Sequence, residues 1–110
     1  MYTELSLKQV LRDESLPEFS APISMEGANA VYYEVTLFYL EATSVSVLVE
    51  ESDDLENWSS PNDSAKTFAG GYDAKRVTGI GSAYVRLRYD MTSSTGEVAV
   101  LGAGINTKRL

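Results

Sequence analysis

The segment AYVRLRYD, residues 83–90, alternates between polar-tipped and apolar side chains along its whole length. In an extended chain Tyr84, Arg86 and Arg88 fall on one side, and the apolar residues between them fall on the other. A strand with one apolar face has to cover that face with a second layer of structure, so this pattern constrains the fold more than any other feature. It predicts a β-strand with one face in a core and one polar face.

Two consecutive segments earlier in the chain also alternate with a period of two residues. In VYYEVTLFYLEA the odd-numbered side chains from Val31 to Tyr39 share one face, and the even-numbered ones from Tyr32 to Leu40 share the other. Both faces carry apolar residues, which predicts a central strand or one covered on both faces over part of its length. TSVSVLVEE follows at once, and we expect these two strands to pair antiparallel.

Shorter strands are expected around residues 66–69 and 75–78, within a stretch rich in Ser, Gly, Asn and Asp. The last strand, VAVLGAGIN, contains Gly102 and Gly104. Glycines inside a strand predict a bulge or close backbone packing.

Turn signals separate the strands. Gly27 and Asn29 in MEGANA tolerate left-handed backbone angles, and Gly96 is expected at the tip of a turn in MTSSTGE. A short basic tail, Lys108 and Arg109, follows the last strand.

Residues 1–18 fit neither period cleanly. We expect an extended arm or a short edge strand there, with one helical turn at residues 7–13 as an alternative. Pro17 and Pro22 keep the path extended and remove two backbone donors, which suits a sheet edge or a connection between strands.

Six to eight short strands without an amphipathic helical pattern predict an all-β fold. We expect an antiparallel β-sandwich with jelly-roll or Greek-key connections. The 110 residues contain no linker and no internal repeat, so residues 1–110 are expected to form a single domain with one core.

The residue types in the chain exclude several classes of function. Cys and His are both absent, so thiolate chemistry, the usual zinc sites and most hydrolase triads lack their side chains. A net charge of -7 disfavours nucleic acid and anionic membranes as partners, and no stretch approaches the ~20 apolar residues of a membrane span. We therefore expect no enzyme activity, no cofactor and no metal. Without a visible signal peptide, the expected location is an assembled particle such as a virion, or otherwise the cytoplasm.

A cluster of acids follows the strand TSVSVLVEE. Its members are Glu50, Glu51, Asp53, Asp54 and Glu56. Calcium binds several oxygen ligands on a short loop, although the spacing here differs from a helix–loop–helix calcium site and no glycine lies at the centre. The alternative is that Ser52, Asp53 and Asn57 close local turns through their side chains while the other acids stay in water.

Trp58, the only tryptophan, lies directly after this cluster. An indole beside acids and an amide can stack on a sugar ring, and it can equally plug the open end of a sandwich core. The candidate carbohydrate-binding residues are therefore Asp53, Asp54, Asn57 and Trp58.

Arg86 and Arg88 are further candidate binding residues, because they project from one side of a strand about 7 Å apart. They can bind a carboxylate of another chain, or pair with glutamates on the neighbouring strand. Glu34 is expected either to face an arginine such as Arg86 or to line an interface. Glu34→Gln is then nearly neutral if Glu34 is exposed, and costs on the order of 1 to 3 kcal/mol if it is in a buried pair.

VEESDDLENW, followed later by AYVRLRYD, resembles the local pattern of discoidin-type, galactose-binding-like β-sandwich domains. In those domains a strand ends in a Ser-Asp turn and a Trp, and a later strand carries an aromatic-Val-Arg alternation. Small virion and tail proteins of bacterial viruses contain similar domains. The chain is shorter than a full discoidin domain and lacks its cysteines, so the resemblance implies a β-sandwich but assigns no binding residue.

We therefore expect a non-enzymatic structural or assembly protein that acts in many copies, docking on itself or on a larger scaffold as virion decoration, capsid-associated and tail components do. Seven tyrosines against three phenylalanines favour a surface that makes contacts, and an N-terminal arm suits strand addition between subunits. The alternative is a carbohydrate-binding module, with a glycan bound at Trp58 and the acidic turn before it.

Overall fold

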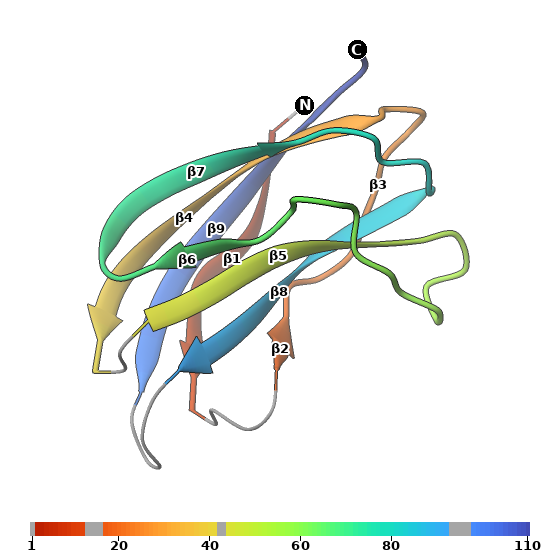
Figure 1. Ribbon diagram of the computed structural model, residues 1–110. Helices are drawn as coiled ribbons and strands as arrows, with labels where there is room; N and C mark the ends of the chain where they lie inside the picture. The colour runs from red at the N-terminus through yellow and green to blue at the C-terminus, as the bar shows by residue number, and fades with distance from the viewer. Residues whose placement is uncertain (1, 13–16, 42–43, 93–97) are drawn as a thin grey trace.

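The computed structural model describes residues 2–12, 17–41, 44–92 and 98–110, which form nine strands in two packed antiparallel sheets (Figure 1). The strands are β1 (Tyr2–Leu11), β2 (Glu18–Phe19), β3 (Ile23–Ser24), β4 (Ala30–Leu40), β5 (Ser44–Ser52), β6 (Lys66–Phe68), β7 (Gly71–Val77), β8 (Tyr84–Thr92) and β9 (Ala99–Lys108). The predicted all-β sandwich is confirmed. None of the described segments is a helix that could cross a membrane.

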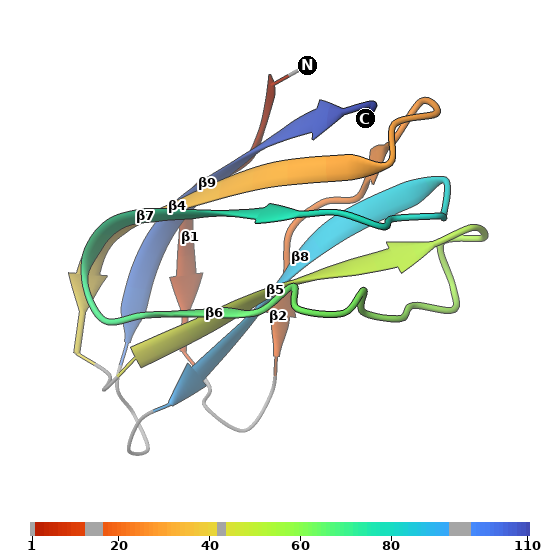
Figure 2. The ribbon, with the colours of Figure 1, turned by 45° about the horizontal axis from the view of Figure 1, so that its top comes forward.

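The strand order is that of a jelly roll. Sheet A runs β1-β9-β4-β7 and sheet B runs β2-β8-β5-β6, with β3 also paired to β8 (Figure 2). Because β2 and β3 lie in succession along β8, they act as one strand interrupted near Pro22, and each sheet then has four strand positions. The described residues form one strand more than the six to eight expected, since pieces of two residues carry no readable period.

The prediction that β4 and β5 pair with each other is wrong. β4 lies between β9 and β7 in sheet A, whereas β5 lies between β8 and β6 in sheet B. The two strands are consecutive in the chain and their apolar faces meet across the core rather than along an edge. Alternation identifies which face of a strand is buried, but it does not identify the neighbouring strand.

The core lies between the sheets and includes two tyrosines whose hydroxyls are satisfied there. Tyr33 donates to the carbonyl oxygen of Ser64 at 2.8 Å, and Tyr89 lies 3.0 Å from Ser6 Oγ. Burial raises the pKa of both phenols, that of Tyr89 to about 12. Because every buried hydroxyl of this pair has a partner, the core tolerates two tyrosines at its centre.

The N-terminal segment is an edge strand and not a free arm. β1 pairs with β9 over its length, with Leu11 and Ser6 buried against the sandwich. The one-turn helix considered for residues 7–13 is therefore wrong over its described part, residues 7–12. Ser6 contributes a polar contact inside the core, which explains why this segment shows no clean alternation.

A bulge in β4 changes which of its side chains face out. The register with β9 shifts between Leu37 and Tyr39, so Tyr39 is exposed although the alternation places it on the buried face. β4 is central, as expected, but its outer face is not covered. The expectation for the β9 glycines is confirmed: a Cβ at Gly102 would lie 2.9 Å from the backbone oxygen of Leu7.

Of the other local predictions, some agree with the structure and others do not. In the first turn Glu26 (φ 51°) and Gly27 (φ 83°) take left-handed angles, while Asn29 does not. β6 matches the strand expected at residues 66–69, whereas β7 begins earlier than the strand expected at residues 75–78. The turn expected around Gly96 lies outside the described residues.

Candidate functional site

Arg86 lies between two aromatic rings on the outer surface of sheet B. Its guanidinium carbon is 3.8 Å from the Phe19 ring centroid and 4.1 Å from the Trp58 ring centroid. Phe19 reaches this place because β2 pairs with β8, and Trp58 because the loop after β5 folds back until Glu51 pairs with Ser59. Each such contact stabilises by about 0.5–2 kcal/mol, depending on its exposure.

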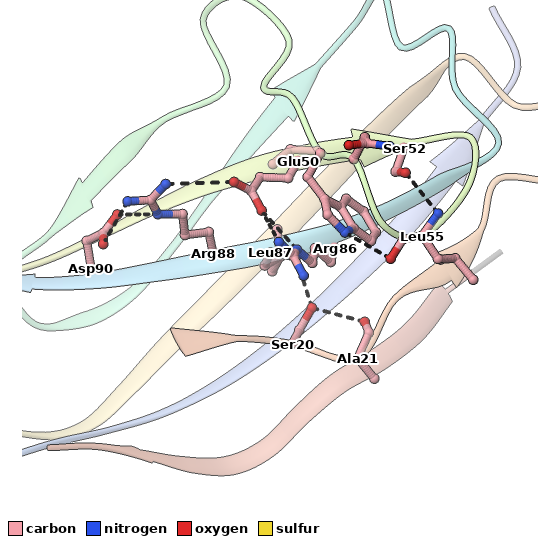
Figure 3. A network of polar contacts seen from close by, with 12 residues as sticks. Ser20, Ala21, Glu50, Ser52, Leu55, Arg86, Leu87, Arg88 and Asp90 are labelled. Atoms are coloured by element: carbon pink, nitrogen blue, oxygen red, sulfur yellow. Dashed lines mark hydrogen bonds and ion pairs between the residues drawn. The ribbon is translucent and has the colours of Figure 1, made fainter. Parts of the chain in front are cut away.

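Glu50 lies beside this stack, with only 10% of its side chain exposed (Figure 3). Arg86 Nε donates to its Oε1 at 2.8 Å, because β5 and β8 set the two residues opposite each other. Arg88 Nη1 lies 3.8 Å from the other carboxylate oxygen, and Arg88 Nε lies 3.0 Å from Asp90. Of the two alternatives for the arginines, the structure has cross-strand pairing. We call the surface of Glu50, Arg86, Arg88, Phe19 and Trp58 the sheet B face.

Asp54 organises the turn that follows β5. Its carboxylate accepts hydrogen bonds from the backbone N–H groups of Asn57 and Glu56 and from the Asn57 side-chain amide, at 2.7–2.9 Å. These donors hold the pKa of Asp54 well below its usual range. Ser52 Oγ in turn accepts from the Asp54 backbone N–H at 3.2 Å. Asp54, and not the expected Asp53, therefore closes this turn.

The neighbouring acids fasten this turn to the loop before β8. Glu51 Oε1 accepts from the backbone N–H groups of Gly81 and Ser82, each at 3.0 Å. Asp53 accepts from the backbone N–H of Ala83 at 2.9 Å. The expectation that the remaining acids of the cluster stay in water is thus wrong for most of them, since they satisfy backbone donors or arginines.

The geometry of this corner does not favour calcium. Across the described ranges, no group of three or more acidic side chains is arranged to hold a metal ion. The carboxylates face different backbone donors instead of converging on one point, whereas calcium requires several oxygens around a single centre.

Trp58 makes its contacts within the protein. One ring face packs on Arg86, and the indole Nε1 donates to the carbonyl oxygen of Leu55 at 3.3 Å. The residue is half-buried and is not part of the buried core, so it does not plug the open end of the sandwich. The contact with Arg86 also takes up a ring face on which a sugar would stack. The structure thus brings Trp58, Arg86 and Arg88 together, with Asp53, Asp54 and Asn57 in the adjacent turn.

The outer surface of sheet A differs, and the sequence pointed to it through Glu34, the glycines of the last strand and the excess of tyrosine. Its exposed aromatic side chains include Tyr2, Tyr32, Phe38 and Tyr72, which are 40–59% accessible. Such exposure means that no described segment covers them. We call the surface formed by the following residues the sheet A face: Tyr2, Glu4, Leu7, Tyr32, Glu34, Thr36, Phe38, Tyr72, Arg76, Gly102 and Gly104. The two-sided apolarity of β4 was the signal for it.

Glu34 lies at the middle of the sheet A face. Tyr72 on β7 donates its hydroxyl to Glu34 Oε2 at 2.9 Å, and this bond raises the pKa of Tyr72 to about 12. On the other side Tyr2 lies over Gly104, and burial together with the charge of Glu34 raises the pKa of Tyr2. The expected pairing of Glu34 with Arg86 is wrong, because Arg86 belongs to the other sheet. That Glu34 lines an interface stays a prediction.

Two hollows occur on the sheet A face, and they differ in charge. The acidic hollow, of about 150 Å³, is lined among others by Tyr2, Glu4, Glu34, Phe38 and Gly104, and both of its charged residues are carboxylates. The basic hollow, of about 370 Å³, is lined among others by Tyr32, Arg76, Asn106 and Lys108, and both of its charged side chains are cations. Gly102 and Gly104 on β9 line the acidic hollow, and their lack of a Cβ lets the Leu7 backbone and the Tyr2 side chain lie close to β9.

No family model matches the chain, and no characterised protein sequence matches it. The resemblance to discoidin-type domains and to small virion proteins therefore stays a prediction.

Proposed function

We propose that this protein is a non-enzymatic structural component that acts in multiple copies in a larger particle, such as a virion decoration, capsid-associated or tail protein, and that it docks through the sheet A face. The observation that carries the proposal is the uncovered group of aromatic side chains on that face. Contiguous exposed apolar patches mark contact sites, and tyrosine and phenylalanine are enriched in protein interfaces.

The strands of sheet A support a contact through side chains rather than through a free arm. β1 is already paired to β9, and it contributes Tyr2 and Leu7 to the surface. An ordered face pays little conformational entropy when it docks, whereas a free arm would have to be ordered at that moment. The face is therefore the better candidate for repeated contacts in a particle.

The jelly-roll topology is compatible with this role, by analogy of fold alone. Jelly rolls recur in viral capsid and lectin domains, so the topology favours neither the assembly role nor the alternative of glycan binding. What separates the two is the state of Trp58. Because its ring already packs on Arg86, the corner proposed for glycans offers less free aromatic surface than the sheet A face.

The proposal is tested by measuring mass in solution. Sedimentation equilibrium from about 1 μM to about 1 mM covers contacts of roughly -8 to -4 kcal/mol. We expect the wild-type mass to rise above the 12.0 kDa of one chain as concentration increases. Phe38→Ser and Tyr72→Ser should shift the rise to higher concentration, since each removes an exposed ring from the face.

Leu55→Ser provides the matched control, because Leu55 is an exposed apolar side chain in the turn after β5, away from sheet A. It should leave the association unchanged. A chain that stays at 12.0 kDa at every concentration, with face variants that behave as wild type, would contradict the proposal. Quenching of Trp58 fluorescence by simple sugars would favour the carbohydrate-binding alternative instead.

A further inference from the structure

The charges of the sheet A face are separated into two ends. The acidic hollow contains Glu4 and Glu34 and no basic residue, whereas the basic hollow contains Arg76 and Lys108 and no acidic one. In a chain of net charge -7 a basic hollow is not expected from composition. Segregation of this kind gives an interface its orientation, because only one docking direction brings opposite charges together.

Neither Arg76 nor Lys108 forms an ion pair with any carboxylate in the described part of the chain. Four other bases form ion pairs among the described residues: Lys66 with Asp73, Lys75 with Asp63, Arg86 with Glu50, and Arg88 with Glu50 and Asp90. Lys8, Arg12 and Arg109 form no ion pair there either. Glu34 lies on the strand next to Arg76 but accepts the Tyr72 hydroxyl instead. The basic end is thus left available for an external anion.

The acidic hollow suits a basic side chain. Its volume of about 150 Å³ is below the ~300 Å³ at which pockets for small molecules begin, so it has room for a single side chain. Two carboxylates supply charge, and the rings of Tyr2 and Phe38 supply π faces that attract cations. Lys8 Nζ lies 5.6 Å from the Phe38 ring centroid, so this ring already contacts one cation of the chain, and Tyr2 and the two carboxylates are the groups left for a partner.

The spacing of the hollows permits two copies to satisfy each other. Both hollows lie over β4 and β9, where Glu34 pairs with Gly104 and Ala30 pairs with Lys108. Four residues of strand separate these pairs, or about 13 Å at ~3.3 Å per residue. A two-fold axis that crosses the strands between the hollows would set the acidic end of each copy against the basic end of the other.

We infer that the sheet A face docks on a second copy of the chain, with Arg76 and Lys108 of each copy facing Glu4 and Glu34 of the other. The inference rests on the proposed function and adds the partner and the direction of docking. The molecule measures 40 × 26 × 22 Å, and the smaller of its two long sides, 40 by 22 Å, has a projected area of about 880 Å². Stable interfaces bury about 800 Å² per partner, which such a face can supply.

Exchange of the charges tests this arrangement. One variant carries Glu4→Lys with Glu34→Lys, and the other carries Arg76→Glu with Lys108→Glu. Each alone sets like charges against each other in both halves of the dimer, so its dissociation constant should rise at least about tenfold. An equimolar mixture restores opposite charges at both ends of a mixed dimer, and should return to the wild-type mass and concentration dependence.

The outcomes separate this inference from the proposed function. If wild type associates and each variant alone associates equally well, the docking direction is wrong and the assembly role stands. The same holds if the mixture of variants stays monomeric although circular dichroism shows that both are folded. If wild type never associates, both fail. Association of wild type should also weaken about tenfold or more at high salt, because exposed charge pairs are screened. A salt-independent mass would contradict the charge-directed contact, as would tighter binding of a basic peptide than of a second copy.

Discussion

Each sheet of the sandwich places a glutamate on its outer surface, Glu50 on sheet B and Glu34 on sheet A, and the two surroundings differ. Glu50 is covered by a stacked arginine and by the loop that carries Trp58, so its charge is compensated inside the chain. Glu34 is held by the Tyr72 hydroxyl on an uncovered surface. One face is therefore completed by the fold itself, whereas the other presents aromatic rings and separated charges to a partner.

The largest effect is expected on the sheet B face, where the chain itself compensates the charge of Glu50. Arg86→Met removes the main partner of a carboxylate that is only 10% exposed, and it removes the cation from between Phe19 and Trp58. We expect a loss of about 3 kcal/mol, because breaking a buried pair leaves an uncompensated charge while Arg88 compensates in part. Urea unfolding followed by circular dichroism measures this loss.

Arg88→Met is the matched control on the same face. Its side chain is 37% exposed and its contact to Glu50 is longer, at 3.8 Å, so the loss should stay below about 1 kcal/mol. Equal losses for the two arginines would show that Glu50 does not depend on Arg86. The charge of Glu50 would then not be compensated mainly by Arg86, and the sheet B face would not differ from the sheet A face in this respect.

The next largest loss of stability is expected from substitutions of the β9 glycines. A Cβ at Gly102 would meet the backbone oxygen of Leu7 at 2.9 Å, which β1 can relieve only by moving away from β9. A Cβ at Gly104 would meet the Tyr2 ring, with its Cε1 at 2.7 Å, and this side chain can rotate into solvent. Gly102→Ala should therefore cost about 1–3 kcal/mol in thermal unfolding, and Gly104→Ala less than about 1 kcal/mol. The reverse order would mean that Tyr2 is fixed in place.

These glycines also show how far the sequence could predict the structure. Period-two patterning identified β4, β5 and β8, and the glycines inside the last strand predicted a bulge or close backbone approach. The partner at Gly102 could not be predicted, because β1 carries a buried Ser6 that breaks its alternation. The pairing of β4 with β7 was missed for another reason: consecutive strands of a jelly roll often belong to opposite sheets, and local sequence does not record that choice.

The candidate site residues likewise divide into those that the local sequence places and those that only the folded chain places. The sequence placed Trp58 beside the acidic turn, and it offered cross-strand glutamates as one of two alternatives for Arg86 without identifying Glu50. It could not place Trp58 over Arg86, because that contact depends on the loop folding back to Glu51. The sheet A face joins residues from the beginning, middle and end of the chain, so only the assembled sheet reveals it.

Glu34→Gln should change stability by less than about 0.5 kcal/mol, in contrast to changes at Glu50. Glu34 is half-exposed, and the amide oxygen of glutamine still accepts the Tyr72 hydroxyl. Urea unfolding of Glu34→Gln beside Glu50→Gln compares the two faces directly. A loss above about 1 kcal/mol at Glu34 would mean that its charge is needed for folding, and the face could not then be regarded as reserved for a partner.

The smallest effect is the titration of Tyr72. Its hydrogen bond to Glu34 raises the pKa to about 12 from the ordinary 10.0, so the bond stabilises the fold fully below pH 10 and loses that contribution as the pH rises through 12. Tyr33 and Tyr89 also titrate late, through burial. The difference in phenolate absorbance between wild type and Tyr72→Phe therefore isolates Tyr72.

In a Glu34→Gln background the same absorbance difference should move back toward 10, because an amide does not oppose phenolate formation as a carboxylate does. Circular dichroism at each pH checks that the chain stays folded. If Tyr72 titrates at the same pH with and without the Glu34 charge, the carboxylate does not hold the phenol. The centre of the sheet A face would then be free to rearrange before a partner docks, and the charge of Glu34 would be fully available to that partner.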